Sequence, residues 1–377
     1  MMMSEILQKT ILHPQHLALN ARMVGFGGWD MPVQYTGIRQ EHLSVRSSGG
    51  LFDISHMGEF LVEGPGACDF LRRCLTNNPD NLSVGMGQYT LMCDHQGGTI
   101  DDLYLYRTRR DAFLMMVNAS RIMDDWQWLT AQCQSLVAEP DSVHCENLSD
   151  QLGALACQGP AARQVIGRLE GEETQPIAHM AKNQIQLTHW QGTPIWVAVT
   201  GYTGEDGYEL IAPNSVIPAI WAWILEQGQA AEIIPAGLGA RDTLRTEMGY
   251  PLYGHELSPE ISPLEAGLGF FVDFNKGDFT GRQAMLEARE RGLSKRSVAF
   301  LMDGKAAPPR AGYRVADQDG NLLGLVTSGT MSPSLEKGLG LAILEGEAKK
   351  PGEGIQIEIR QRWYPATVVR KPMYRKA

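Results

Sequence analysis

Two adjacent carboxylates follow a pair of glycines and are the first candidates for chemistry. Asp101 and Asp102 come shortly after Gly97-Gly98, in a segment expected as a strand. Adjacent strand residues point to opposite faces, so Asp102 shares a face with Tyr104 and Tyr106, whereas Asp101 shares one with leucines. For Asp101 a structural role is favoured, in which its carboxylate accepts backbone N–H bonds of the turn. For Asp102 a ligand role stays equally open, because a carboxylate beside two tyrosines suits a flat ligand and could stabilise positive charge developing on it.

A glycine-rich segment at residues 200–209 is the second candidate. Its three glycines within seven residues allow a tight turn or a close approach to a ligand. Tyr202 could stack on a planar heterocycle, and Glu209 could accept two N–H bonds from the adjacent donors of a pterin. The alternative is a hairpin loop whose tyrosine and glutamate face solvent, and the residues alone favour that alternative.

Arg241 and Arg245 lie one turn apart on a helix predicted for residues 237–247. This spacing usually marks a solvated face of ion pairs. An arginine that faces a cleft could instead attract the carboxylates of a folate tail.

Histidines and cysteines give no metal signature. The nine histidines and six cysteines show no zinc-ligand spacing, and dispersed cysteines of this kind are expected to be reduced. His56 lies in Asp53-Ile54-Ser55-His56-Met57, within a strand predicted for residues 51–62. A hydrogen-bonded structural histidine is favoured there over a catalytic base.

The elements around these residues predict an α+β fold. Strands are expected at 89–93 and 100–106, on either side of a turn at 94–98. Beyond residue 297, short apolar strands separated by turn residues predict a small β-barrel or sandwich. Helices and strands alternate without a βαβ rhythm, which favours antiparallel sheets. A chain of 377 residues is expected to form two or three domains.

Composition excludes some partners. The net charge of -10 argues against nucleic acid as the main partner, because phosphate binding needs a concentrated basic surface. No apolar run approaches the roughly 20 residues that span a bilayer, so no membrane association is expected. The N-terminal residues lack the features of a secretory or transit signal, and we therefore expect a cytoplasmic protein.

At these residues the chain resembles the aminomethyltransferase family, the T-proteins of the glycine cleavage system. The resemblance runs through nearly the whole length, and its strength comes from the order of several motifs that are weak alone. The segments that carry it are 27–32, 50–58, 97–103, 200–207, 236–245, 276–282 and 327–333.

The resemblance implies an α+β fold with three domains in a cloverleaf-like arrangement. It has antiparallel sheets, a central folate channel and a C-terminal β-barrel or jelly-roll-like domain. The expected first α+β domain comprises residues 1–50 and 140–235, and the second comprises 51–139 and 236–290. The barrel is expected at residues 291–377.

The resemblance also implies an enzyme that uses tetrahydrofolate as co-substrate and needs no metal. Its partner would be the lipoylated H-protein, whose lipoyl arm carries an aminomethyl group. Transfer of the methylene to tetrahydrofolate would release ammonia. The family's catalytic carboxylate matches Asp102, and its folate contacts match Tyr89, Asp102, Tyr202, Glu209 and Arg241.

Three residues depart from the family pattern. Val199 stands where an arginine is usual, Arg121 where many members have asparagine, and Asp124 where they have lysine. The nearest rival function is a folate-dependent demethylase of the same superfamily. A folate-binding iron–sulfur assembly factor is a second rival, which is disfavoured because residues 276–282 lack that group's signature cysteine.

Overall fold

The structure, a computed structural model, describes residues 6–137, 139, 142–169, 176–346 and 349–376. The chain divides into two compact units. The first comprises Met1–Leu71, Pro79–Tyr89 and Leu103–Arg241, and the second comprises Arg72–Asn78, Thr90–Asp102 and Asp242–Ala377. The three-domain arrangement and its boundaries stay a prediction. The cytoplasmic location is predicted from the N-terminal segment. Residues 1–5 of that segment lie outside the described residues.

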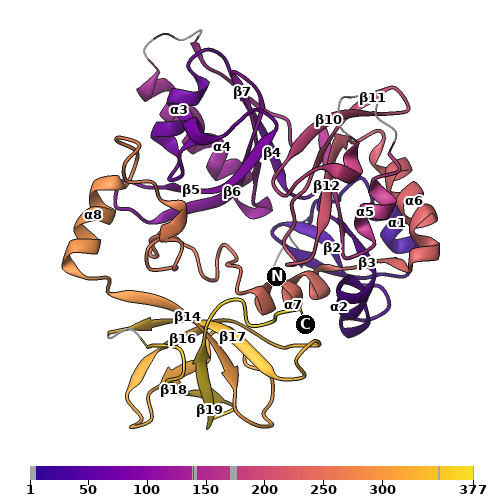
Figure 1. Ribbon diagram of the computed structural model, residues 1–377. Helices are drawn as coiled ribbons and strands as arrows, with labels where there is room; N and C mark the ends of the chain where they lie inside the picture. The colour runs from indigo at the N-terminus through magenta and orange to yellow at the C-terminus, as the bar shows by residue number, and fades with distance from the viewer. Residues whose placement is uncertain (1–5, 138, 140–141, 170–175, 347–348, 377) are drawn as a thin grey trace. The chain divides into compact units, whose positions relative to one another are not determined.

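A six-stranded sheet forms the larger part of the first unit, in the order β10-β11-β12-β9-β3-β13. An apolar core covers one of its faces, where helices α5 and α6 contribute buried side chains. Helices α1, α5 and α6 lie beside this sheet (Figure 1). The bounds are β3 Gly49–Asp53, β9 Leu152–Gln158, β10 Ile185–Trp190, β11 Thr193–Ala198, β12 Gly207–Pro213, β13 Ile233–Pro235, α1 His13–Ala18, α5 Ala162–Ile166 and α6 Ile217–Gly228.

The last two strands of this sheet, β3 and β13, run parallel, with Pro235 opposite Leu51. Their carboxyl ends therefore lie at the same edge of the sheet. Helix α7, Leu238–Met248, begins there directly after β13. Ligand sites are common at such an edge.

A five-stranded sheet has the order β5-β6-β7-β4-β8. One face packs against helix α4, where the Phe60 and Trp126 ring centroids are 5.3 Å apart. The bounds are β4 Gly58–Glu63, β5 Met86–Cys93, β6 Thr99–Arg109, β7 Ala112–Val117, β8 His144–Asn147, α3 Ala67–Cys74 and α4 Ile122–Leu136. A hairpin, β1 Arg22–Phe26 and β2 Trp29–Gln34, precedes helix α2, Ile38–Ser47.

The strand predicted at 51–62 is wrong as a single element, because a turn separates β3 from β4. The Met57 N–H donates to the Ile54 carbonyl, and the Ser55 N–H donates to the Asp53 carboxylate. An aspartate whose side chain accepts a backbone N–H two residues later favours a turn over a continuing strand. His56 therefore lies in a turn.

The second unit contains a closed barrel in the order β14-β17-β16-β15-β18-β19 (Figure 1). Closure removes the free sheet edges, and alternate side chains fill the interior. The bounds are β14 Lys295–Met302, β15 Arg314–Ala316, β16 Leu322–Met331, β17 Gly338–Glu345, β18 Gly354–Ile359 and β19 Arg362–Val369, with helix α8 at Arg282–Arg291 before them. The predicted α+β class with antiparallel sheets and a C-terminal barrel is confirmed.

Short 3₁₀ helices connect several of these elements, at Pro79–Asn81, Ala119–Arg121, Ile177–His179, Gln229–Ala231 and Gly269–Phe271. Within the described ranges, no helix has both the length and the apolar character needed to cross a bilayer.

Candidate functional site

One face of the five-stranded sheet is lined by tyrosines, and a glycine makes room for them. The rings of Tyr104 and Tyr106 on β6 have centroids 5.0 Å apart. A Cβ on Gly87 of β5 would lie 2.5 Å from the Tyr106 ring and 2.8 Å from the Tyr104 ring, so only glycine fits there. Tyr89 comes two residues later on β5 and faces the same side. We call this surface the tyrosine face.

The tyrosine face meets strand β12 of the other sheet through Tyr106. The Tyr106 hydroxyl lies 2.8 Å from Thr200 Oγ1 and donates to Glu209 Oε2 at 3.5 Å. Burial, together with the nearby Glu209 carboxylate, raises the pKa of Tyr106 well above its usual value, so the phenol remains protonated. The Tyr104 hydroxyl donates to Asn183 Oδ1 at 2.6 Å.

Glu209 is held in place by Thr200. The Thr200 hydroxyl donates to Glu209 Oε2 at 2.6 Å. On β12, Tyr208 and Leu210 point into the apolar core, so Glu209 points to the opposite face. A carboxylate with a fixed orientation suits a ligand that presents two adjacent N–H groups.

The glycines of segment 200–207 accommodate a protein side chain, Gln158. A Cβ on Gly201 would lie 1.9 Å from Gln158 Oε1, and one on Gly207 would lie 2.3 Å from its Nε2. Gln158 Nε2 donates to the Thr200 carbonyl at 3.0 Å, and the Thr203 hydroxyl donates to Gln158 Oε1 at 2.9 Å. The segment is therefore a fixed support for Thr200 and Tyr202.

Arg241, near the start of α7, extends over the ring of Tyr202, with Cζ 5.1 Å from the ring centroid. Its Nη1 is buried and has no hydrogen-bond partner. Burial lowers the pKa of the guanidinium, and the negative charge of Glu209 opposes this shift. Arg241 is thus a cation beside Glu209 and Tyr202 with an N–H group left over for a ligand.

His56 lies at the same edge, after β3, and only 2% of it is exposed. Its Nδ1 is buried without a partner. Burial lowers its pKa to about 4; the Asp53 carboxylate opposes this shift and the Arg241 cation adds to it. The imidazole is therefore neutral at pH 7.

The carboxylate of Asp53, three residues before His56, is hydrogen-bonded within the protein. It accepts from the Thr10 hydroxyl at 2.7 Å and the Ser55 N–H at 2.9 Å, and it lies 2.9 Å from His16 Nε2. Burial alone would raise the pKa of Asp53, but these hydrogen bonds outweigh it, and the pKa lies below its ordinary value. Asp53 therefore supports the edge as a charged, satisfied anchor.

Asp101 and Asp102 alternate in burial on β6, as their neighbours do. Asp101 is fully buried, like Leu105, and Asp102 is half-buried, like Tyr104. The prediction that the two acids face opposite sides of the strand agrees with this pattern. Asp102 belongs to the second unit, and its place beside a pterin stays a prediction.

The first unit brings three of the predicted folate contacts together: Tyr202, Glu209 and Arg241. Tyr89 lies on the tyrosine face. The sequence argument missed Gly87, which belongs to no motif. It also missed the hydrogen bond between Tyr106 and Thr200, which connects the two sheets. Strand alternation had already put Tyr106 among the candidates, but no sequence signal linked it to Thr200.

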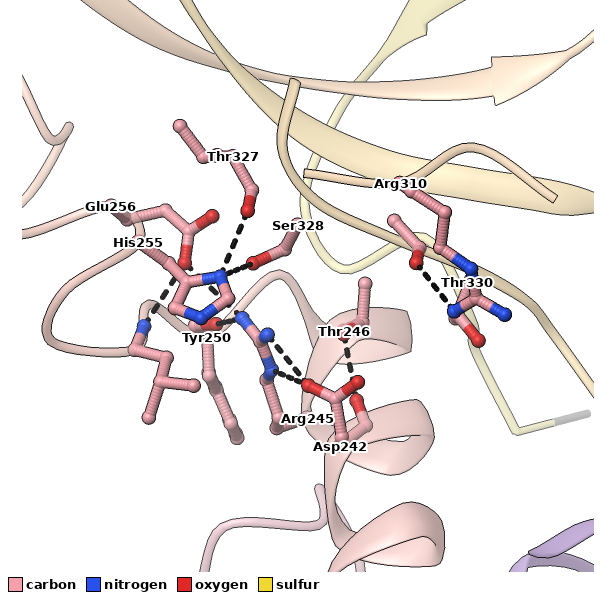
Figure 2. Close-up of polar contacts among 12 residues, drawn as sticks. Asp242, Arg245, Thr246, Tyr250, His255, Glu256, Arg310, Thr327, Ser328 and Thr330 are labelled. Carbon is pink, nitrogen blue, oxygen red and sulfur yellow. Dashed lines mark hydrogen bonds and ion pairs between the residues drawn. The ribbon is translucent and has the colours of Figure 1, made fainter. Parts of the chain in front are cut away.

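The expectation of a solvated ion-pair face is wrong for Arg245, which is only 2% exposed. In the second unit its guanidinium donates to Asp242 Oδ1 at 2.6 Å and to Glu256 Oε2 at 3.1 Å (Figure 2). It also donates to the Tyr250 carbonyl at 3.3 Å. The ion pair with the buried Glu256 carboxylate allows the Arg245 guanidinium to be buried. The spacing of residues along one helix could not reveal Glu256 as its partner.

Two of the residues expected to depart from the family pattern, Arg121 and Asp124, form an ion pair. Arg121 Nη1 donates to Asp124 Oδ2 at 2.5 Å, in an i,i+3 ion pair near the start of α4. The third departure, Val199, is buried in the apolar core of the six-stranded sheet. The side chain at position 199 therefore contributes to core packing.

The fold and the site together define an α+β protein with a C-terminal barrel, in which Tyr202, Glu209 and Arg241 lie together at one sheet edge. Comparisons with known proteins make this specific. The GCVT N-terminal domain family matches residues 12–276, and the glycine cleavage T-protein C-terminal barrel domain family matches residues 295–375. The chain therefore belongs to the aminomethyltransferase family, the T-proteins of the glycine cleavage system.

Similar proteins cover the full length. An aminomethyltransferase of Caldanaerobacter subterraneus subsp. tengcongensis is 43% identical over 98% of this chain and 96% of its own. One of Lysinibacillus sphaericus is 40% identical over 100% of both chains. The crystal structure of glycine cleavage system aminomethyltransferase T from Bartonella henselae has a TM-score of 0.89 and 30% identity, and covers 98% of each chain. The predicted family and class of enzyme, a folate-dependent aminomethyltransferase, are confirmed.

Proposed function

We propose that this enzyme transfers the methylene carbon of an aminomethyl group from the lipoyl arm of H-protein to tetrahydrofolate. The methylene loses its bonds to sulfur and to the amino nitrogen and gains bonds to N5 and N10 of the folate. The protons released from N5 and N10 leave with the thiol and with ammonia. The observation that carries the proposal is the convergence of Glu209, Arg241 and Tyr202 in a chain that belongs to this family over its whole length.

The residues of the first unit fit a folate. Glu209, fixed by Thr200, would accept N–H bonds from the amino group and ring nitrogen of the pterin. Tyr89 and Tyr202 would provide ring faces for the flat heterocycle. The unpartnered N–H of Arg241 would donate to an oxygen of the folate.

Asp102 is the proposed catalytic residue. An ionised carboxylate near N10 would hold the ring and offset the positive charge that develops during transfer. Because no covalent enzyme intermediate is needed, alignment of the two substrates supplies much of the acceleration. Effective molarities for well-oriented groups reach about 10⁵ M or more. We place this reaction in the cytoplasm.

The test is a reconstituted reaction of the purified chain, tetrahydrofolate and aminomethylated, lipoylated H-protein, with ammonia release as the readout. Release that depends on all three components is the expected result, and unlipoylated H-protein is the control. Absence of ammonia contradicts the proposal. Methyl transfer from a small sulfonium in its place would favour the demethylase.

A further inference from the structure

Two buried polar atoms without a partner belong to side chains at the same sheet edge. They are Nδ1 of His56 and Nη1 of Arg241. Leaving a buried polar group unsatisfied costs about 1–3 kcal/mol, and more for a charged one. Two such atoms at one place indicate a missing hydrogen-bond partner.

The backbone brings these two side chains together. Strands β3 and β13 are parallel neighbours, and the Ala236 N–H donates to the Leu51 carbonyl at 2.9 Å just where β13 ends. His56 follows β3 by three residues, and Arg241 lies in the first turn of α7. The positive charge of Arg241 contributes to the lowered pKa of His56, in agreement with this arrangement.

The N-terminus of α7 is not the anion site at this edge. Glu41 Oε2 accepts the Gly237 N–H at 2.9 Å, and its Oε1 accepts the N–H groups of Tyr35, Thr36 and Gly37. A protein carboxylate thus already occupies the position that a bound anion would take at a helix start. A ligand that arrives here meets Arg241 and His56.

Because both nitrogens can act as hydrogen-bond donors, the ligand atom that suits them is an acceptor oxygen. A guanidinium only donates, and a neutral imidazole can donate from Nδ1 when Nε2 is bare. An acceptor oxygen that reaches both nitrogens would satisfy both, whereas a cation would be repelled by Arg241. Phe26 packs edge-on against the His56 ring, with centroids 5.9 Å apart, and holds its orientation.

We propose that His56 and Arg241 form a two-donor site for a single carbonyl or carboxylate oxygen of the folate substrate. The inference rests on the proposed function and assigns a ligand contact to His56, which the sequence argument treated as structural. The oxygen comes either from the glutamate tail or from the pterin ring. The two sources share one chemistry, and ligand fragments separate them.

The experiment compares His56→Phe with His56→Asn. Phenylalanine keeps a ring for Phe26 but has no donor, whereas asparagine places an amide N–H close to the position of Nδ1. We expect the Kd for tetrahydrofolate to rise about tenfold in His56→Phe, the loss of one hydrogen bond to a polar ligand. In His56→Asn it should stay within about threefold of the unmodified enzyme.

A tetrahydropterin without the benzoylglutamate tail identifies the source. If its Kd is unchanged in His56→Phe, the oxygen belongs to the tail, and if it rises, the oxygen belongs to the pterin ring. Either result supports the two-donor site. Equal losses in the Phe and Asn variants, or none in either, would overturn it.

Nitrogen NMR of the unmodified enzyme, labelled with ¹⁵N-histidine, keeps the test independent of variant folding. The His56 signal, assigned by its loss in a His56 variant, should move when tetrahydrofolate binds. A purely structural histidine would not move, and that outcome rejects the inference. If the unmodified enzyme binds no folate at all, the failure lies with the proposed function.

Discussion

Helix α7 carries two arginines, one turn apart, that the protein treats in opposite ways. Arg245 is buried, and its donors are taken by Asp242, Glu256 and the Tyr250 carbonyl (Figure 2). Arg241 lies over Tyr202 with a buried Nη1 that has no partner. The hydrogen-bonding capacity of Arg245 is used within the protein, whereas Arg241 retains a donor without a partner.

The difference lies in the partners that each arginine meets. Glu256 is fully buried, and its interaction with Arg245 offsets the desolvation of both groups. Beside Arg241, Glu209 is engaged by Thr200. The protein thus bears a desolvation cost at Arg241 that a bound anion would relieve.

The largest expected effect is the loss of stability in Arg245→Met. Removing one partner of a buried pair leaves the Glu256 carboxylate uncompensated, which typically costs about 3–5 kcal/mol. Urea unfolding measures the loss. The double variant with Glu256→Leu should recover part of it, because no buried charge remains. A loss below about 1 kcal/mol in the single variant would mean that Arg245 is not structurally essential.

Asp102→Asn tests whether the negative charge of Asp102 stabilises the positive charge that develops during transfer. We expect kcat to fall by about 10²–10³-fold, the usual effect of removing one group aimed at developing charge. The Kd for tetrahydrofolate should stay within about threefold, because asparagine keeps the shape and one acceptor. Ammonia release and ligand titration give the two numbers. Equal losses in both would reduce Asp102 to a binding residue.

His56 should make the enzyme sensitive to acid. Its folded pKa of about 4 lies below the unfolded value near 6.5, so the unfolded state binds the proton first as pH falls. Stability from this group is present above pH 6.5 and is lost between pH 6.5 and 4, by about 3 kcal/mol. His56→Phe should unfold with a flatter pH dependence across that window. Parallel profiles for both proteins would contradict this.

Arg241→Met is the counterpart of the Arg245 variant. We expect the Kd for tetrahydrofolate to rise about 10- to 100-fold, as a charge-assisted hydrogen bond of about 1.5–3 kcal/mol is lost. The free energy of unfolding should change by less than about 1 kcal/mol, since the lost contact over Tyr202 is small and a desolvation cost is removed. A large loss of stability with unchanged binding would reverse the comparison.

Local pattern predicted much of the fold. The alternation of residues 101–106 gave the right faces of β6, and the turn residues beyond 297 gave the barrel. The strand at 51–62 failed because Asp53 and Ser55 form a turn through a side-chain hydrogen bond, which hydrophobic pattern does not show.

Family motifs pointed to residues that the fold brings together, but they did not reveal contacts between distant segments. Tyr202, Glu209 and Arg241 came from the resemblance, since spacing alone favoured a solvent-facing loop. The bond between Tyr106 and Thr200 joins residues 94 positions apart, and no local rule links them. The burial of Arg245 depends on Glu256 in the same way, because only tertiary structure brings that carboxylate to the helix.

The smallest expected effect belongs to Thr200→Val, which removes the donor that orients Glu209. Valine keeps the shape of threonine, so the change isolates one hydrogen bond of about 1 kcal/mol, and the Kd for tetrahydrofolate should rise about fivefold. Thr200→Ser retains the hydroxyl and is the matched control. Calorimetric titration of both variants gives the difference. If valine binds as tightly as serine, then Glu209 needs no support from Thr200, and the Tyr106 hydroxyl suffices to hold it.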